Sequence, residues 1–491
     1  MHNFGAVMQG MSARWARSLA TPTAAVPGTG LACSAGMDTA TVTERPFLPG
    51  TDPGPRRRAL AAGLLMGVAL APAATKAVEL NPELRLPPQD PAGADLARRP
   101  EEPRNITPRS RPRPELDPLG ARIRSFMLLT SVDLGLGYND NLRATQEDRQ
   151  TDLYSILKPQ AEMRSDWSRH ALGFGADATL GRYQDFTNEN YDDWQAFLNG
   201  RLDLGRASSL SAEASVRRLH EDAASPDAEN AVETSQYKAT ETRAVWTHPF
   251  GRFEFRLAAD ITDYRFDSVQ TAFLPPGTLT GTDRNRQTTS GEGRLAYSVW
   301  PGYGAFIRAG YTKQNYDSRA PDGTDRDSTG YTADVGLDLE LTDLIFGDVS
   351  VGYYRQKYAD ADFSPNSGLG FGANVYWNVT QLSTLHLEVN RAVQQSTQPG
   401  ASGYLGTEAA LQLEHELLRN LLLFVGTSRT QRTYEGLDRE ETLYQHNFGV
   451  TYMLNRHLYL RLRGVHRDQQ GTNGGRDFTQ NFVEQTLVLQ H

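Results

Sequence analysis

The chain has 491 residues, of which 38% are hydrophobic, and it contains a single cysteine. Its 50 basic and 59 acidic residues give a formal net charge of −9, and its mean hydropathy is −0.53. This polarity excludes a bundle of membrane-spanning helices, each of which needs about 20 apolar residues. The composition does not exclude a membrane β-barrel, because half of the residues in each of its strands can be polar. The acidic balance argues against nucleic-acid binding, and a lone cysteine argues against a disulfide framework or a thiolate metal site.

A secretory signal is predicted over residues 56–77, RRRALAAGLLMGVALAPAATKA. Three arginines precede an apolar run, and the small residues that follow suit cleavage after Ala73 or Ala77. The run is shorter than the roughly 20 residues of a spanning helix, so a retained anchor is the weaker alternative. We therefore assign residues 1–77 to an upstream extension plus signal peptide, with Met37 as a candidate initiator.

Residues 78–119 are predicted to form a proline-rich periplasmic linker. The stretch RPEEPRNITPRSRPRPELDP interleaves proline with charged residues. Proline-rich segments favour the extended polyproline II conformation and act as semi-rigid spacers. We therefore expect this segment to be extended rather than packed, either reaching a periplasmic partner or the cell wall or lying disordered.

From residue 120 onward, apolar and polar residues alternate with the period of two that is typical of β-strands. These segments are longer than the ~5–6 residues of most soluble strands and reach the ~9–11 residues of a tilted transmembrane strand. We count about 18 of them, with 16 as the lower bound. They span residues 126–138, 152–164, 169–185, 192–205, 208–220, 234–247, 251–266, 286–299, 303–316, 328–341, 345–358, 368–379, 382–395, 403–416, 420–434, 442–454, 457–467 and 477–489.

Short and long connections alternate along this region. Tight turns such as DWSR, HPFG, WPGY and LNRH are separated by longer polar loops at 221–233, 267–285 and 317–327. An up-and-down barrel with short periplasmic turns and longer outer loops has this alternation of loop lengths. A soluble sandwich does not require its short and long loops to alternate. The sequence therefore predicts an all-β fold, a transmembrane up-and-down antiparallel β-barrel over residues 120–491, with both ends of the barrel on the periplasmic side.

Each strand should then have a lipid face and a lumen face. In HLYLRLRGVH (457–466) the leucines alternate with tyrosine and arginine. In a sandwich the leucines would face a core, and in an outer-membrane barrel they would face lipid; the loop rhythm favours the barrel. The residues expected to line the lumen are Arg201, Asp203, Glu254, Arg256, Asp260, Asp334, Asp338, Glu340, His386, Glu388, Tyr459, Arg461 and Arg463. The aromatic residues expected in interfacial girdles are Trp194, Trp300, Tyr303, Trp377 and Tyr434.

Three stretches resemble the family named putative β-barrel porin 2. They are RPRPELDPLGARIRSFMLLTSVDLGLGYNDNL (111–142), SDWSRHALGFGADATLGRYQDFTNENYDDW (165–194) and RLHEDAASPD (218–227). The resemblance implies an outer-membrane barrel and, for some relatives, passage of secreted polysaccharide together with a periplasmic export partner. The family has no established catalytic residues to carry over. One departure is the C-terminus, FVEQTLVLQH, where His491 stands in place of the aromatic residue with which outer-membrane barrels usually end.

These observations predict a porin-like channel in the outer membrane of a Gram-negative cell, surrounded by outer-membrane lipid. Its cargo would be exopolysaccharide or other polar solutes, its partner a periplasmic polysaccharide-export protein, and it would need no cofactor. The alternatives are a non-transporting structural or surface-binding barrel and an outer-membrane barrel enzyme. An enzyme would need converging His, Asp or Ser groups, but the histidines are scattered and form no HExxH motif. The acidic stretches GYNDN and DRDSTG lack the spacing of an EF-hand loop.

Overall fold

The computed structural model describes residues 106–491, apart from 206, 229–233, 271–278, 342–343, 397 and 399. The predicted signal peptide and the first part of the predicted linker lie outside the described residues. Within the described ranges, no helix is long and apolar enough to cross a membrane.

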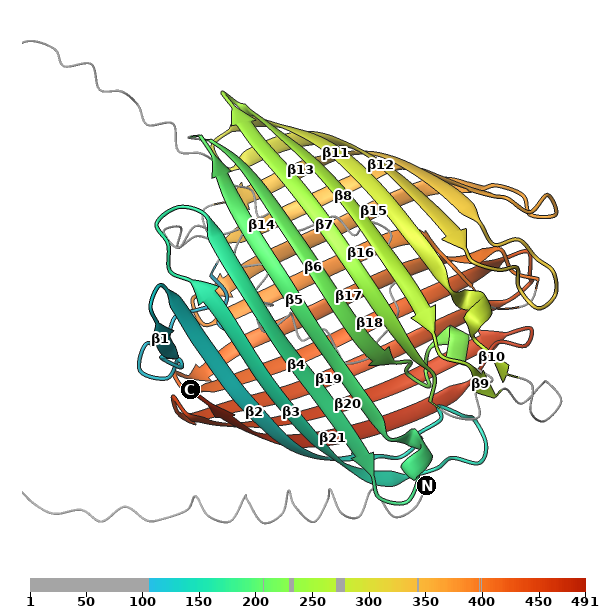
Figure 1. Ribbon diagram of the computed structural model, residues 1–491, viewed down its shortest axis with the longest axis horizontal. Helices are drawn as coiled ribbons and strands as arrows, with labels where there is room; N and C mark the ends of the chain where they lie inside the picture. The colour runs from blue at the N-terminus through green and yellow to red at the C-terminus, as the bar shows by residue number, and fades with distance from the viewer. Residues whose placement is uncertain are drawn as a thin grey trace, which may run out of the picture. The chain divides into compact units, whose positions relative to one another are not determined.

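The wall is one antiparallel sheet that closes on itself (Figure 1). The sheet has 19 strands, of which the three-residue β1 (Ala121–Ile123) pairs only with β2. The other 18 follow each other around the barrel in chain order. They are β2 (Phe126–Asn139), β3 (Asp152–Ser165), β4 (Ala171–Tyr183), β5 (Tyr191–Leu204), β6 (Ser208–His220), β7 (Gln236–Phe250), β8 (Phe253–Phe266), β11 (Arg286–Trp300), β12 (Tyr303–Tyr316), β13 (Ser328–Leu341), β14 (Ile345–Tyr358), β15 (Asn366–Thr380), β16 (Ser383–Gln394), β17 (Gly403–Leu418), β18 (Leu421–Glu435), β19 (Glu440–Asn455), β20 (Leu458–Thr472) and β21 (Phe478–Gln490).

Each of the 18 predicted segments corresponds to one strand of this wall, so the predicted barrel is confirmed. The largest error in the boundaries is at β20, which continues to Thr472 although the alternation suggested an end at residue 467. The small hairpin of β9 (Val269–Gln270) and β10 (Leu279–Thr280) was not predicted. Nor were the short 3₁₀ turns η1 (Thr187–Glu189), η2 (Pro226–Ala228) and η3 (Thr282–Arg284), all of which lie in the longer loops.

The barrel closes where its first and last long strands pair. β2 and β21 run antiparallel from the Ser131–Gln490 pair to the Asn139–Phe482 pair. Beyond that range, the backbone N–H of His491 donates to the carbonyl of Thr130 at 2.9 Å. β1 pairs with the first three residues of β2, which β21 does not reach. This closure satisfies the backbone groups that an open sheet edge would expose to lipid.

The two ends of the barrel differ in their connections. At what we name the short-turn end, β7–β8 and β11–β12 are joined by two-residue turns that contain Gly251 (φ 62°) and Gly302 (φ 84°). Glycine adopts this left-handed conformation without the penalty that a Cβ atom imposes. At the opposite, long-loop end, the connections reach their greatest length at 221–235 and 267–285, while the β18–β19 connection is only 436–439. The contrast in length is therefore strongest in the first half of the barrel.

Apolar side chains cover the outward face of the wall. Leu136 is 71% exposed, Ile307 58% and Val335 56%, whereas the inward Arg256 is only 7% exposed. In β20 the same alternation leaves Leu462 39% exposed and Tyr459 9% exposed. This arrangement is the reverse of a soluble protein, because the apolar positions are the accessible ones and contact lipid.

The aromatic residues predicted to form girdles separate into two groups. Trp194, Trp300, Tyr303 and Trp377 are exposed on the outward face, as expected. For Tyr434 the prediction was wrong, since its side chain is 3% exposed and its hydroxyl donates to Glu441 Oε2 at 3.2 Å. Position 434 shares the inward parity of β18, and nearness to a strand end does not by itself decide which face an aromatic occupies.

The last part of the predicted linker contacts the barrel. Within residues 106–119, Arg113 is 2% and Leu116 8% exposed, and both pack against the inner side of the wall at the short-turn end. Backbone hydrogen bonds from Leu116 and Asp117 to the carbonyl of Arg113 form a compact turn. The described end of this segment is therefore packed, in contrast to the extended spacer that its composition suggested.

Candidate functional site

The inner face of the barrel is the candidate site. The 13 residues predicted to line the lumen share the less exposed face of β5, β8, β13, β16 and β20, opposite in parity to the exposed apolar residues of the same strands. That they line an open channel stays a prediction. Their side chains are largely engaged with neighbours on the same face. Arg201, for example, pairs with Asp203 at 3.1 Å between Nε and Oδ1.

Ion pairs join strands of this face, either neighbouring strands, as for Arg308 on β12 and Asp334 on β13, or strands on both sides of a third, as for Arg294 on β11 and Asp338 on β13. Asp338 Oδ1 lies 2.5 Å from Arg294 Nη2, and Asp334 Oδ2 lies 3.0 Å from Arg308 Nε. Arg256 is in register with Arg294, which is in register with Arg308. Asp334 is in register with Arg308, so the inner wall carries both signs of charge side by side. Arg294 and Arg308 were not among the predicted residues, although the alternation of β11 and β12 places them inward.

A second group of charges lies near the seam of the barrel. Arg461 Nη1 is 3.2 Å from Asp133 Oδ2, which joins β20 to β2 across β21. Asp133 was also missed, yet it alternates with Leu134 and Leu136 in the sequence and could have been found from that pattern. The Asp133–Arg461 pair shows that residues of both charges also line the inner wall where β2 and β21 close the barrel.

His386 belongs to a row of stacked rings on the inner wall. Its ring lies 4.0 Å from that of Tyr376 at an angle of 3°, and Tyr376 stacks on Phe346 at 4.9 Å. His386 Nε2 is also 3.0 Å from Asn374 Oδ1. These contacts fix the imidazole as part of the wall. In the described part of the chain, no group of three or more His, Cys, Asp or Glu residues could hold a metal ion.

A buried polar cluster, named here the Arg432 cluster, lies on the inner wall toward the long-loop end. Arg432 is fully buried, and its Nη1 lies 3.4 Å from Glu441 Oε2 and 3.2 Å from Gln469 Oε1. Glu441 also pairs with Arg439, at 3.1 Å to Nε. Because buried charges are costly unless they are paired, the members of this cluster depend on one another.

The loop of residues 221–228 folds inward across the long-loop end. It leaves β6 but contacts the far part of the wall, where Asp222 Oδ2 lies 3.2 Å from Arg467 Nη1 on β20. Arg476, in the β20–β21 connection, donates to two carbonyls of the loop, and Gln398, in the β16–β17 connection, donates to a third. The loop therefore lies over the lumen and is held at its far side by contacts with these connections.

The base of the loop is fixed by a buried pair. Arg284 Nη1 lies 2.9 Å from Glu221 Oε2, with side chains only 9% and 5% exposed. The neighbouring Asp283 pairs with Arg326 at 2.5 Å between Oδ2 and Nη2. These two ion pairs join three connections at the long-loop end, namely β6–β7, β8–β11 and β12–β13.

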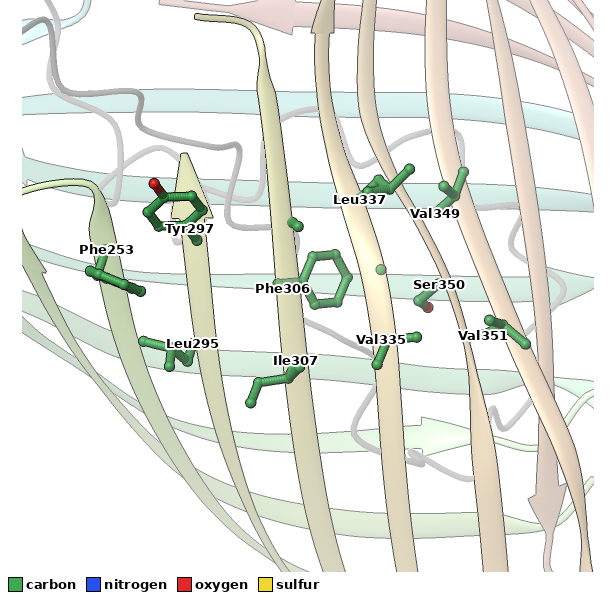
Figure 2. Close-up of a pocket in the computed structure, with 12 residues that line it drawn as sticks. Phe253, Leu295, Tyr297, Phe306, Ile307, Val335, Leu337, Val349, Ser350 and Val351 are labelled. Carbon is green, nitrogen blue, oxygen red and sulfur yellow. The ribbon is translucent and has the colours of Figure 1, made fainter. Parts of the chain in front are cut away.

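The outward face carries an apolar hollow of about 710 Å³ (Figure 2). Figure 2 shows Leu295, Ile307, Val335 and Val351 around it, on four successive strands from β11 to β14. The hollow belongs to the surface that meets lipid, and it offers almost no polar group to a dissolved solute. The polar inner wall therefore remains the candidate functional site.

The profile of the family described as putative beta-barrel porin 2 matches residues 113–491. No curated protein matches the chain. Among solved structures, the chain is similar to the siderophore receptor PirA from Acinetobacter baumannii, with 8% identity and a TM-score of 0.44 over 74% of this chain and 80% of that one. It is also similar to the outer membrane protein OpdK from Pseudomonas aeruginosa, with 12% identity and a TM-score of 0.40 over 74% of this chain and 99% of that one.

The family match covers every long strand of the closed wall, from β2 to β21. Together with the apolar outward face, it identifies an outer-membrane barrel. The chain belongs to the putative beta-barrel porin 2 family.

Proposed function

We propose that the protein is a porin-like conduit that lets polar solutes cross the outer membrane, with exopolysaccharide as the candidate cargo. The observation that carries this proposal is the inner wall, where both signs of charge lie beside hydroxyl and aromatic groups. A barrel of 16–18 strands can leave an aqueous channel. Mixed charges suit a hydrated, neutral or weakly charged polymer, because charged groups make strong hydrogen bonds and sugar rings can pack against aromatic faces.

The proposed orientation places the short-turn end in the periplasm and the long-loop end outside the cell, as in other outer-membrane barrels. In this orientation a periplasmic polysaccharide-export partner would meet the short-turn end. The predicted signal peptide of a Gram-negative cell agrees with this topology.

Single-channel recording tests the conduit. The refolded chain, inserted into planar lipid bilayers, is expected to give discrete conductance steps, and added oligosaccharide should reduce the current through them. The same chain, heat-denatured before addition, is the control. Absence of steps from the folded chain, and also from folded variants that lack the segments lying in the lumen, would contradict a conduit.

The cargo needs a separate experiment in the native cell. Deletion of the gene should reduce released polysaccharide while the intracellular precursor accumulates, and a plasmid copy should restore release. Neighbouring genes for glycosyltransferases and a polysaccharide co-polymerase would support export. Intact capsule or slime after deletion would eliminate polysaccharide as cargo and leave a general diffusion pore.

A second candidate is a non-transporting structural or surface-binding barrel. The inward fold of residues 221–228 favours it, since this loop lies across the lumen. The bilayer recording separates the two candidates. His386, the histidine predicted on the lumen face, is engaged with Asn374 and Tyr376 and not with a nucleophile, so it gives no support to an enzymatic role.

A further inference from the structure

The segment Ile106–Asp117, which we name the strap, lies on the inner wall at the short-turn end. Three wall residues donate hydrogen bonds to carbonyls of the strap. Asn378 of β15 reaches its first residue at 3.2 Å, Arg456 in the β19–β20 turn reaches Pro114 at 3.5 Å, and the Tyr459 hydroxyl reaches Leu116 at 2.7 Å. The strap therefore extends along the mouth from β15 to β20.

Arginines at every second position attach the strap to β17. Arg111 Nη1 and Arg113 Nη2 lie 3.0 and 2.8 Å from the same oxygen, Glu416 Oε2. The side chains of Arg113 and Glu416 are only 3% and 4% exposed. Arg109 adds a pair with Glu414 at 3.5 Å. Both glutamates are inward residues of the wall, so the strap lies inside the barrel and not beside it.

Further contacts hold the C-terminal part of the strap. Arg419, in the β17–β18 turn, pairs with Glu115 of the strap at 2.9 Å, and its carbonyl accepts from Arg113 Nε at 3.0 Å. Leu116 packs with Met453 and Val488 in a small buried cluster. Pro108, Pro112 and Pro114 are interspersed with the arginines. Because proline has fixed φ, the segment loses less backbone entropy when it docks.

We propose that the strap is a gate at the short-turn mouth of the conduit. Docked, it occupies the lumen beside β15–β20 and restricts passage; released from Glu414 and Glu416, it leaves the mouth open. This inference rests on the proposed conduit. The role of the strap is separate from that of the loop of residues 221–228, which lies at the long-loop end.

Single-channel conductance of the full chain tests the gate. In one variant, residues 109–116 are replaced by Gly and Ser at equal length, which leaves the wall unchanged. In a second variant, Arg111→Glu and Arg113→Glu place like charges opposite Glu416. Both variants are expected to raise the unit conductance or the open fraction at least two-fold over the unmodified chain.

Arg122→Glu is the matched control, because Arg122 is exposed at the same end and pairs with Asp166 outside the strap. It should conduct as the unmodified chain does. Equal conductance of the unmodified chain and both strap variants would overturn the gate and leave the conduit standing. Absence of conductance from every folded variant would overturn both.

A reversible disulfide between the strap and the wall tests the gate even if the strap variants fail to fold. Leu116→Cys with Val488→Cys, in a Cys33→Ser background, places two thiols within one cluster. Oxidation should hold the strap closed and abolish openings, and dithiothreitol should restore them. Identical conductance of the oxidised and reduced forms would overturn the gate.

Discussion

At the scale of single residues, Arg432 and Glu441 show how the inner wall accommodates charge. Their side chains are 0% and 1% exposed, so neither can be solvated if its partner is lost. Glu441→Gln keeps the shape but leaves the Arg432 guanidinium without its counter-charge. We expect a loss of about 3–5 kcal/mol in the free energy of unfolding, the usual cost of breaking a buried pair from one side.

Urea unfolding of the refolded barrel, followed by tryptophan fluorescence, measures this loss. Asp166→Asn is the control, because its pair with Arg122 has side chains that are 56% and 62% exposed. An exposed pair of this kind contributes up to about 1 kcal/mol. Similar losses in the two variants would show that the lumen hydrates Arg432.

At the scale of elements, each strand divides its residues between lipid and lumen. Val335, near the middle of β13, is 56% exposed on the outward face. Val335→Arg should destabilise the folded barrel in a lipid bilayer by about 2–4 kcal/mol, because an arginine near the midplane faces hydrocarbon.

Folding equilibria in phospholipid vesicles check this prediction. The same change at Thr332, which faces inward on the same strand, is the control and should cost about 1 kcal/mol or less, since lumen positions can hydrate a charge. Equal costs at the two positions would contradict the assignment of faces.

The faces of the strands could be predicted from the sequence because alternation depends only on neighbouring residues. Arg294, Arg308 and Asp133 follow the same rule, so the alternation identifies them as inward residues as well. The two covers of the lumen could not be predicted, since they depend on partners far apart in the chain. Asp222 and Arg467 are 245 positions apart, and Arg113 and Glu416 are 303 positions apart. No local pattern in a proline-rich or polar loop identifies such partners.

Removal of the loop of residues 221–228 should raise the single-channel conductance. Replacement of residues 222–228 by a short Gly-Ser turn removes the contacts with Arg467 and Arg476. We expect a larger single-channel conductance in planar bilayers, because the polar side chains that cross the lumen are gone. Shortening the exposed loop at 361–365 is the control and should leave conductance unchanged. A conductance that does not respond to the first replacement would place the narrowest point elsewhere.

At the scale of the whole molecule, one seam decides whether the wall is a barrel or an open sheet. Thr130 and His491 exchange both backbone hydrogen bonds, so the next pair inward, Ser131 and Gln490, is a non-hydrogen-bonded pair. Such pairs bring Cβ atoms closest together and suit a disulfide.

Ser131→Cys with Gln490→Cys, in a Cys33→Ser background, should therefore form a disulfide in the folded protein and not in the urea-unfolded chain. The bond joins β2 to β21 and closes a covalent loop around the barrel, so the unfolded protein should migrate faster on non-reducing gels. Ser131→Cys with Val488→Cys, shifted by two residues, is the control and should cross-link much more slowly. Faster cross-linking of the shifted pair would mean that β21 pairs with β2 in another register. In that register the ion pair between Asp133 and Arg461, which spans β21, would not form.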